Sequence, residues 1–583
     1  MTWTVKTRWQ VTAATTIALV ATACLFTVRH LRAATPASAA QDVLLSTMQQ
    51  ELHRAQTELG KLDPAPYFIS YSGYDEEVAI AVGMQGSLMN STHARRRLAN
   101  VVMRLGTPAL DNTHEENRWS AISSGALPLA DDRDALARTL WQMSYQEYRK
   151  AARTYLNVKT KTQVQAKEED TSADFSQEKS QNRLNYQQLP PPPEQRVLED
   201  MVRRSSAILA QYPYIYNSMA IVAEQQIRFH FVSTEGSQVV SPRATIRFAI
   251  QAQARADDGM ELVRVETFEA EDVNHIPPSN EIAERVKKMA SDLKSLRSAP
   301  VAEPFEGPAL LSGRAAAVFF HEVLGHRLEG QRQKGENEGQ TFARKINEQV
   351  LPDFLSVIDD PTQRTLDGVQ LAGWYDEDDE GIPASRVPVI QNGILKNFLM
   401  SRMPIKNFAQ SNGHGRAEAG LMPTGRQGNL LVTSSRRIKD AELRQRLIDE
   451  IKKQGKPYGL YFEDIQGGFT LTQRAMPQAF QVLPVLVWRV YPDGRSDELV
   501  RGVSIVGTPL AALSHILVTG DTTSVFNGVC GAESGSIPVA AAAPAMLFSD
   551  IEVQKQAHAL NRPPILPPPG FENLPASKLG GEH

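Results

Sequence analysis

Hydrophobic residues recur at helical spacing in the first half of the chain. Leu44, Leu45, Met48 and Leu52 fall on one helical face, which predicts a helix over residues 41–60. The same spacing predicts helices over residues 131–155, 198–211 and 280–296. Alternating or β-branched runs predict strands over residues 67–71, 78–82, 98–105, 227–234 and 244–253, the last two joined by a turn at Glu235-Gly236-Ser237.

The second half of the chain has mostly the period of strands. Asn392-Gly393 predicts a tight turn between two of them. The strands are expected over residues 387–390, 395–400, 429–433, 458–464, 481–491 and 498–506. We therefore predict an α+β fold, in which a mixed N-terminal α/β region precedes a β-rich C-terminal domain.

Changes in composition predict the domain boundaries. A leader over residues 1–40 precedes an N-terminal region over 41–300, a C-terminal domain over 301–560 and a flexible tail over 561–583. Inside the N-terminal region, residues 159–195 are polar, lack hydrophobic periodicity and close with four prolines at 190–193. This stretch is predicted to be a surface linker whose first part can extend the preceding helix.

The leader has the composition of an export signal. Lys6 and Arg8 precede an apolar run over residues 11–28, and Ala37-Ser38-Ala39 follows as a small-residue cleavage site. The run is also just long enough to span a bilayer, so an uncleaved membrane anchor is the alternative. We expect a protein exported to the periplasm or the cell exterior, either cleaved after the leader or anchored by it.

Overall composition is that of a globular protein. The 583 residues are 42% hydrophobic and 22% charged, with a net charge of −4, which excludes a wholly disordered chain. A nucleic-acid-binding protein needs a basic stripe, and Arg95-Arg96-Arg97 is a short cluster of the kind found on solvated faces. We therefore expect no nucleic-acid partner.

Cysteine is rare in this chain. Cys24 lies in the leader and Cys530 near the other end. A chain cleaved after the leader keeps one thiol and cannot form an internal disulfide. Cys530 is thus either a small buried hydrophobe or a metal ligand.

Residues 315–330 hold the most informative pattern. The segment is predicted as one helix that ends at Gly330. On an ideal helix Glu322 lies about 100° and His326 about 140° from His321, while apolar residues occupy the opposite side. The preceding turn is apolar all round, which indicates a buried helix rather than a solvated polar face. Buried histidines and carboxylates need a partner, and a divalent metal is one.

The spacing of the two histidines differs from the common zinc-peptidase motif. His-Glu-x-x-His places its histidines four residues apart, whereas His321 and His326 are five apart. On a regular helix the two rings diverge, so either a π-bulge or an ion between divergent side chains is required. The motif alone also lacks a third ligand.

Several segments together resemble the TldD/PmbA family of metallopeptidases, once called modulators of DNA gyrase. The resemblance extends over about residues 65–555 and is carried, in chain order, by Ser233-Thr234-Glu235-Gly236-Ser237, Phe320-His321-Glu322 through Gly325-His326, Leu328-Glu329-Gly330, Asp379-Glu380-Gly381, Asn392-Gly393, Asn412-Gly413-His414-Gly415-Arg416, and Gly528-Val529-Cys530-Gly531 with Ser536-Ile537-Pro538-Val539. Members of the family are typically cytosolic, and in this respect the leader is a departure.

The resemblance implies a zinc ion held by His321, His326 and Cys530, with Glu322 as the catalytic residue. It also implies a peptide substrate and a dimer, formed either with a second copy or with a related subunit that lacks the metal motif. Because this chain keeps the motif, it resembles the active TldD-like partner. The expected activity is hydrolysis of unfolded or small peptides, with Glu322 as general base.

Three further residues are candidates for supporting roles. Glu329 is expected either to accept a ring N–H from His326 or to be a surface glutamate. His414 and Arg416 are expected either to bind an oxyanion or substrate carboxylate or to be structural. The alternative to an enzyme is a non-catalytic scaffold or partner subunit with a structural zinc, which needs a fourth ligand, and His414 is the candidate for it.

Overall fold

The computed structural model describes residues 42–114, 121–162, 170–334, 338–473, 480–556 and 569–570. The leader expected at residues 1–40 lies outside the described residues, as does nearly all of the tail expected at 561–583. In the part of the chain that is described, no helix has both the length and the apolar character needed to span a membrane.

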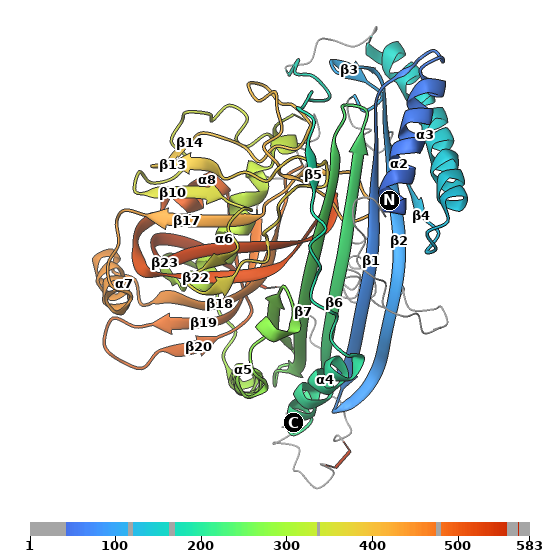
Figure 1. Ribbon diagram of the computed structural model, residues 1–583. Helices are drawn as coiled ribbons and strands as arrows, with labels where there is room; N and C mark the ends of the chain where they lie inside the picture. The colour runs from blue at the N-terminus through green and yellow to red at the C-terminus, as the bar shows by residue number, and fades with distance from the viewer. Residues whose placement is uncertain are drawn as a thin grey trace, which may run out of the picture.

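A tall, mostly antiparallel sheet forms the N-terminal region (Figure 1). Its long strands are β1 (Pro66–Met84), β2 (Ser87–Thr107), β6 (Ile215–Ser233) and β7 (Gln238–Arg255). Counting described residues only, the sheet has eight strands in the order β3-β2-β1-β6-β7-β5, with β4 on β2 and β8 on β7. The short strands are β3 (Leu110–Asp111), β4 (Ile122–Ala126), β5 (Asn182–Leu184) and β8 (Glu261–Ala270).

Four helices pack against this sheet. They are α2 (Val43–Leu59), α3 (Arg133–Thr162), α4 (Gln195–Leu209) and α5 (Ser279–Ser298). α2 begins where the Asp42 carboxylate accepts a hydrogen bond of 2.8 Å from the Leu45 amide, a normal N-cap. Its buried residues share a core with α3 and strands β1 and β2, and α4 and α5 cover a second core over β6, β7 and β8.

The strands of this sheet are longer than hydrophobic alternation predicts. The two short strands expected at 67–71 and 78–82 are one strand, β1, because the polar residues between them pair with β2 on one side and β6 on the other. The turn expected at Glu235-Gly236-Ser237 does join β6 to β7, with Gly236 at φ 94°. Within the polar stretch 159–195, α3 continues to Thr162, and Phe175 is buried against Phe68 with ring centroids 4.7 Å apart.

A second sheet forms the C-terminal region. It has 11 strands among the described residues, in the order β14-β13-β10-β17-β23-β21-β19-β18-β9, with β20 on β19 and β22 on β23. Because β9 (Phe305–Leu311) pairs with both β18 (Gly459–Thr470) and β23 (Gly535–Lys555), this part of the sheet closes on itself. The remaining strands are β10 (Leu355–Asp359), β13 (Val387–Gln391), β14 (Ile394–Leu395), β17 (Asn429–Ser434), β19 (Phe480–Val490), β20 (Glu498–Val500), β21 (Val503–Gly507) and β22 (Ile516–Ala532).

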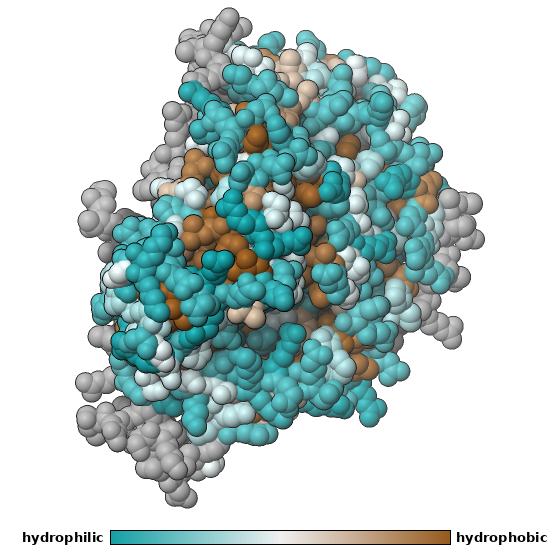
Figure 2. Space-filling view, turned by 90° about the vertical axis from the view of Figure 1, so that its left-hand side faces the viewer, coloured by the Kyte–Doolittle hydropathy of each residue, from teal (hydrophilic) through white to brown (hydrophobic). Residues whose placement is uncertain are grey.

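Helix α6 (Gly313–Val323) lies inside the C-terminal region and α7 (Asp440–Gln454) at its outside (Figure 1), while α8 (Pro509–Ser514) buries Leu513 in the core of the region. Two-stranded pairs β11 (Thr365–Leu366) with β12 (Val369–Gln370) and β15 (Gly415–Arg416) with β16 (Thr424–Gly425) occupy the connections. The strand expected at 395–400 is much shorter than predicted: β14 spans only Ile394–Leu395. Figure 2 shows the side of this region that carries α7, where a patch of hydrophobic residues is surrounded by hydrophilic ones.

Candidate metal centre

Helix α6 is fixed tightly within the C-terminal region. Ser312 caps it by accepting a hydrogen bond of 3.1 Å from the Ala315 amide, and every residue from Gly313 to Val323 except Arg314 is buried. The Phe319 ring packs edge-on against Phe480 and Phe548, with centroids 5.7 and 5.5 Å away. These contacts set the position of His321 and Glu322, which lie in the last turn of the helix.

The prediction of one helix through Gly330 is wrong. α6 ends at Val323, and two 3₁₀ turns follow, η5 (Gly325–Leu328) and η6 (Gly330–Gln333). The backbone after the helix forms an isolated bridge with the loop at Leu399 instead, since Leu399 donates to the Leu328 carbonyl and Gly330 donates to the Leu399 carbonyl, both at 2.8 Å. His326 therefore lies beyond the end of the helix. The angle of about 140° expected between the two histidines on an ideal helix does not hold, and no π-bulge is needed to bring them together.

Gly325 permits this change of direction. A Cβ placed there would lie 1.8 Å from Gln427 Oε1, so the Gln427 side chain occupies the space that any larger residue would need. The chain can then carry His326 back toward His321. Their rings lie 5.0 Å apart and nearly perpendicular, at 77°.

The structure brings His321, His326 and Cys530 together. One potential ligand atom from each lies within 4.8 Å of those of the other two, and all three residues are buried. Cys530 comes from β22, which packs on α6, and its sulfur lies 3.3 Å from His326 Nε2. Two imidazoles and a thiol that share one point are the donors that zinc prefers.

Electrostatics at this cluster favour a thiolate. Burial alone would raise the pKa of Cys530, but His326 and His321 lower that pKa well below its usual value. Burial would likewise lower the pKa of His326, but Cys530 and Glu329 raise it well above its usual value. His321 Nδ1 is buried without a hydrogen-bond partner among the described residues, and a metal ligand would satisfy this atom.

Glu329 orients the second histidine. One of its carboxylate oxygens lies 3.0 Å from His326 Nδ1, and the other accepts a bond of 3.1 Å from Arg332 Nε. When Nδ1 donates to this carboxylate, Nε2 presents its lone pair toward Cys530. Because Glu329 is fully buried, the alternative of a surface glutamate does not hold.

Glu322 lines the same cavity as the three cluster residues. The cavity has a volume of about 350 Å³ and lies between α6, β18 and β22. Gly468 of β18 faces Glu322, and a Cβ at that position would lie 3.0 Å from Glu322 Cγ. Glu322 is not one of the three residues whose potential ligand atoms converge.

The structure places His414 and Arg416 outside this cavity. His414 is fully buried, with Nε2 3.2 Å from Asp359 Oδ1 and Nδ1 3.0 Å from Asn412 Oδ1. Arg416 donates to Asp379 and borders a separate cavity of about 330 Å³ between the two sheets. Both contacts fit the structural alternative considered for these residues.

Two supporting residues give no signal in the sequence. Arg426 is fully buried and donates to the Cys530 carbonyl at 2.7 Å and to Ser534 Oγ at 2.8 Å, which holds the β22–β23 hairpin. Gln427 fills the space at Gly325. Both residues follow β16 and lie about a hundred positions from the groups that they support, so only the tertiary fold could identify them.

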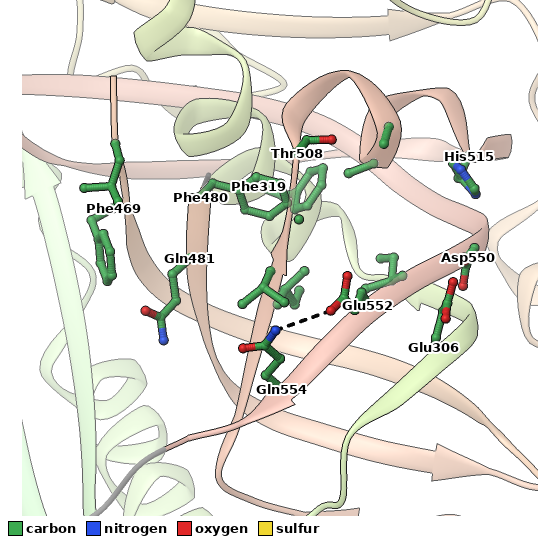
Figure 3. Close-up of a pocket in the computed structure, with 17 residues that line it drawn as sticks. Glu306, Phe319, Phe469, Phe480, Gln481, Thr508, His515, Asp550, Glu552 and Gln554 are labelled. Carbon is green, nitrogen blue, oxygen red and sulfur yellow. Dashed lines mark hydrogen bonds between the residues drawn. The ribbon is translucent and has the colours of Figure 1, made fainter. Parts of the chain in front are cut away.

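Figure 3 shows a second, larger cavity of about 690 Å³ in the C-terminal region. Phe469 of β18 borders both cavities, and Phe319 and Phe480 contribute further aromatic lining. Glu306, Asp550 and Glu552 supply carboxylates to this lining, and Gln554 donates to Glu552 at 3.3 Å.

Comparison with known proteins identifies the C-terminal region. Residues 305–555 match the model of the PmbA/TldA metallopeptidase C-terminal domain. A metalloprotease TldD homolog from Buchnera aphidicola is 24% identical over 332 residues, which are 55% of this chain and 64% of the relative. A metalloprotease from Archaeoglobus fulgidus is 26% identical over 267 residues, which are 46% of this chain and 57% of the relative. The match thus spans less than two thirds of either relative.

A further relative is named for its metal, and two solved structures share the fold. A zinc metalloprotease TldD homolog from Saccharolobus solfataricus is 23% identical over 374 residues, 62% of this chain and 76% of the relative. A protein described as a modulator of a DNA gyrase from Thermotoga maritima superposes with TM-score 0.59 and 15% identity, over 87% of this chain and 99% of the other. TldE from Thermococcus kodakarensis superposes with TM-score 0.56 and 12% identity, over 87% and 100%.

These structures confirm the predicted fold class, a mixed α/β region followed by a β-rich C-terminal region. The family model and the curated relatives also confirm the resemblance seen in the sequence motifs. Residues 305–555 thus match the metallopeptidase C-terminal domain of the TldD/PmbA family, and the chain as a whole is similar to TldD homologues in sequence and to a TldE protein in fold.

Proposed function

We propose that this chain is a zinc-dependent peptidase that hydrolyses unfolded or small peptides. The observation that carries the proposal is the convergence of His321, His326 and Cys530 in a cavity that Glu322 also lines. The metalloprotease names of its curated relatives support the same reaction class.

The cluster fits zinc through its donor chemistry. Two imidazole nitrogens and one thiolate are ligands of a zinc site, and the lowered pKa of Cys530 favours the anionic form that binds metal. Zinc bound there supplies Lewis acidity, which polarises a scissile carbonyl and lowers the pKa of water. Three protein donors leave a coordination position free, as in catalytic rather than structural sites.

Other residues at the site have roles in proton transfer and in orienting the histidine. Glu322 would accept a proton from the attacking water and return it to the leaving amine. Glu329 holds the His326 ring by its contact of 3.0 Å with Nδ1, so that Nε2 faces the cavity. The short distance between β18 and Glu322, set by Gly468, limits the space beside the general base.

A scaffold with a structural zinc is the alternative. It needs a fourth protein ligand, and within the described ranges the converging group has three members. His414, the candidate for that fourth position, is hydrogen-bonded to Asp359 and Asn412 instead. This arrangement favours the enzyme.

The assembly and the location of the protein belong to the same proposal. Likeness of fold to a TldE protein supports a dimer, either of two copies or with a related subunit. The net charge of −4 supports a chain without a nucleic-acid partner. The leader composition supports export to the periplasm or the cell exterior. Intact mass of the protein from its native host tests this point, since cleavage predicts an N-terminus near Ala40 or Gln41, and a full-length chain in the cytosol would contradict export.

Peptide hydrolysis tests the proposed activity. The purified full chain should cleave an unfolded peptide, lose that activity in a chelator and regain it when zinc is added back. A folded protein with one bound zinc and no cleavage of any unfolded peptide would favour the scaffold.

A further inference from the structure

The outward face of α3 carries large hydrophobic residues in solvent. Trp141, Tyr145 and Leu156 are 53%, 50% and 57% exposed, although residues of these types are usually buried. Their spacing places them along one side of the helix. The Trp141 and Tyr145 rings are stacked, with centroids 6.4 Å apart and an interplanar angle of 20°.

The opposite side of α3 is packed against the core of the N-terminal region. Leu136, Leu140 and Met143 are buried there and share a core with α2 and with strands β1 and β2. The exposed aromatic residues are therefore not displaced core residues. They are presented outward by a helix whose inner side is already packed.

α3 is also strongly basic. Its 30 residues include two acidic side chains, Asp134 and Glu147, and Glu147 is buried. The basic side chains of the helix are Arg133, Arg138, Arg149, Lys150, Arg153, Lys159 and Lys161. Arg149 lies over the Tyr145 ring, with Cζ 5.6 Å from the centroid, so aromatic and cationic groups share the outward face.

We propose that this α3 face, made of Trp141, Tyr145 and Leu156 with the surrounding Arg138, Arg149 and Arg153, docks on an anionic lipid surface. Aromatic residues at the level of the headgroups and basic residues around them are the features of helices that lie in a membrane interface. Each Lys or Arg near an anionic surface strengthens binding, and Asp134, in the first turn, is the one exposed acidic residue of the helix.

The position of the face within the chain supports a bilayer as the partner. α2, the first described helix, packs against α3 (Figure 1). Where the leader stays uncleaved as an anchor, the thirteen residues 29–41 link the apolar run at 11–28 to the start of α2 over at most about 45 Å. A second copy of the chain fits less well, since a twofold contact through this face would oppose like charges.

Vesicle binding of the full chain tests the proposal. We expect binding to vesicles that contain phosphatidylglycerol, weakened at least about tenfold by Arg149→Glu with Arg153→Glu, and reduced at high salt. Arg285→Glu with Lys287→Glu is the control, because it changes the same charge at exposed positions of α5. The leader is identical in all variants, so any difference arises at the substituted helix.

Fluorescence distinguishes contact by α3 from contact by the leader alone. Brominated lipids should quench the tryptophan emission of the wild type more than that of Trp141→Phe. Equal quenching, or equal vesicle binding by the α3 and α5 charge variants, would overturn the proposal. A loss of oligomeric mass in Trp141→Ala would also overturn it, because the face would then be a contact between copies.

Discussion

Helices α6 and α3 use polar residues in opposite ways. Every residue of α6 except Arg314 is buried, yet its last turn holds His321 and Glu322. α3 is almost three times as long, 30 residues against 11, and directs most of its charges outward. Polar groups on α6 must therefore find partners inside the protein, whereas those on α3 are solvated.

This contrast explains where the chemistry lies. The fold brings His326, Cys530 and Glu329 into contact. Against the effect of burial, His326 and His321 lower the pKa of Cys530 well below its usual value, which favours the thiolate that binds metal. The outward residues of α3 need no partner inside the protein and are free to contact the lipid surface proposed above. Substitutions on α6 should thus affect activity strongly, and those on α3 should have little effect on it.

Removal of the general base should give the largest effect. Glu322→Gln keeps the size of the side chain, so fold and zinc content should remain while peptide cleavage falls by about 100-fold or more. Steady-state hydrolysis and metal analysis of the same sample check this. Cleavage at the wild-type rate would place the base elsewhere, and loss of zinc would make Glu322 a ligand.

Loss of the carboxylate behind His326 should have a smaller effect. Glu329→Gln removes the charged acceptor 3.0 Å from Nδ1, and zinc affinity or activity should fall by about 10–100-fold. Glu338→Gln is the matched control, since Glu338 also pairs with Arg332. Equal effects of the two substitutions would show that Glu329 acts through Arg332 and not through the histidine.

The change of direction after α6 should depend on Gly325. Gly325→Ala forces its Cβ into Gln427, which should lower the free energy of unfolding by about 1–3 kcal/mol. Gln427→Ala opens that space, so the double variant should recover part of the loss. Denaturant unfolding of the four proteins measures this coupling, and additive losses would rule out the contact as the cause.

The smallest effect concerns the one buried carboxylate of α3. Burial raises the pKa of Glu147 to about 8, although Lys150 lowers it in part. The folded state then binds a proton that the unfolded state loses above about pH 4.5, so this group's contribution to stability falls between about pH 5 and pH 8. Glu147→Gln should therefore be close to neutral at pH 4 and stabilising by roughly 1–3 kcal/mol at pH 9.

Thermal unfolding at the two pH values measures this difference. Asp134→Asn, at an exposed acidic position of the same helix, is the control. A gain in Glu147→Gln that is the same at both pH values would contradict the assigned cause.

The sequence predicted these two helices with unequal success. α3 was predicted because its apolar residues follow the helical period, although the helix begins at Arg133 and ends at Thr162 rather than spanning 131–155. The segment after α6 was not predicted correctly. Gly330 hydrogen-bonds through its backbone to Leu399, and Gly325 leaves room for the Gln427 side chain, and no local pattern encodes either contact. Tertiary pairing replaced the propensity for a continuous helix.

The residues of the candidate site also differ in how far local sequence patterns could predict them. His321, Glu322 and His326 could be selected from one local motif, whereas the link to Cys530 came from resemblance to a family and not from spacing. His414 and Arg416 were considered because they are chemically suitable, but their partners Asp359 and Asp379 lie elsewhere in the sequence. Chemical type alone therefore does not identify which polar residues share a cavity.

Zinc content of the purified chain tests the central claim most directly. Wild type and Cys24→Ala should each carry about one zinc, and Cys530→Ala should lose most of it, since a cluster of two histidines holds zinc weakly. Metal analysis at matched protein concentration, with unfolding curves to confirm the fold, gives the answer. If Cys530→Ala keeps full zinc and full peptide cleavage, Cys530 is a buried thiol and the three-residue metal site is wrong.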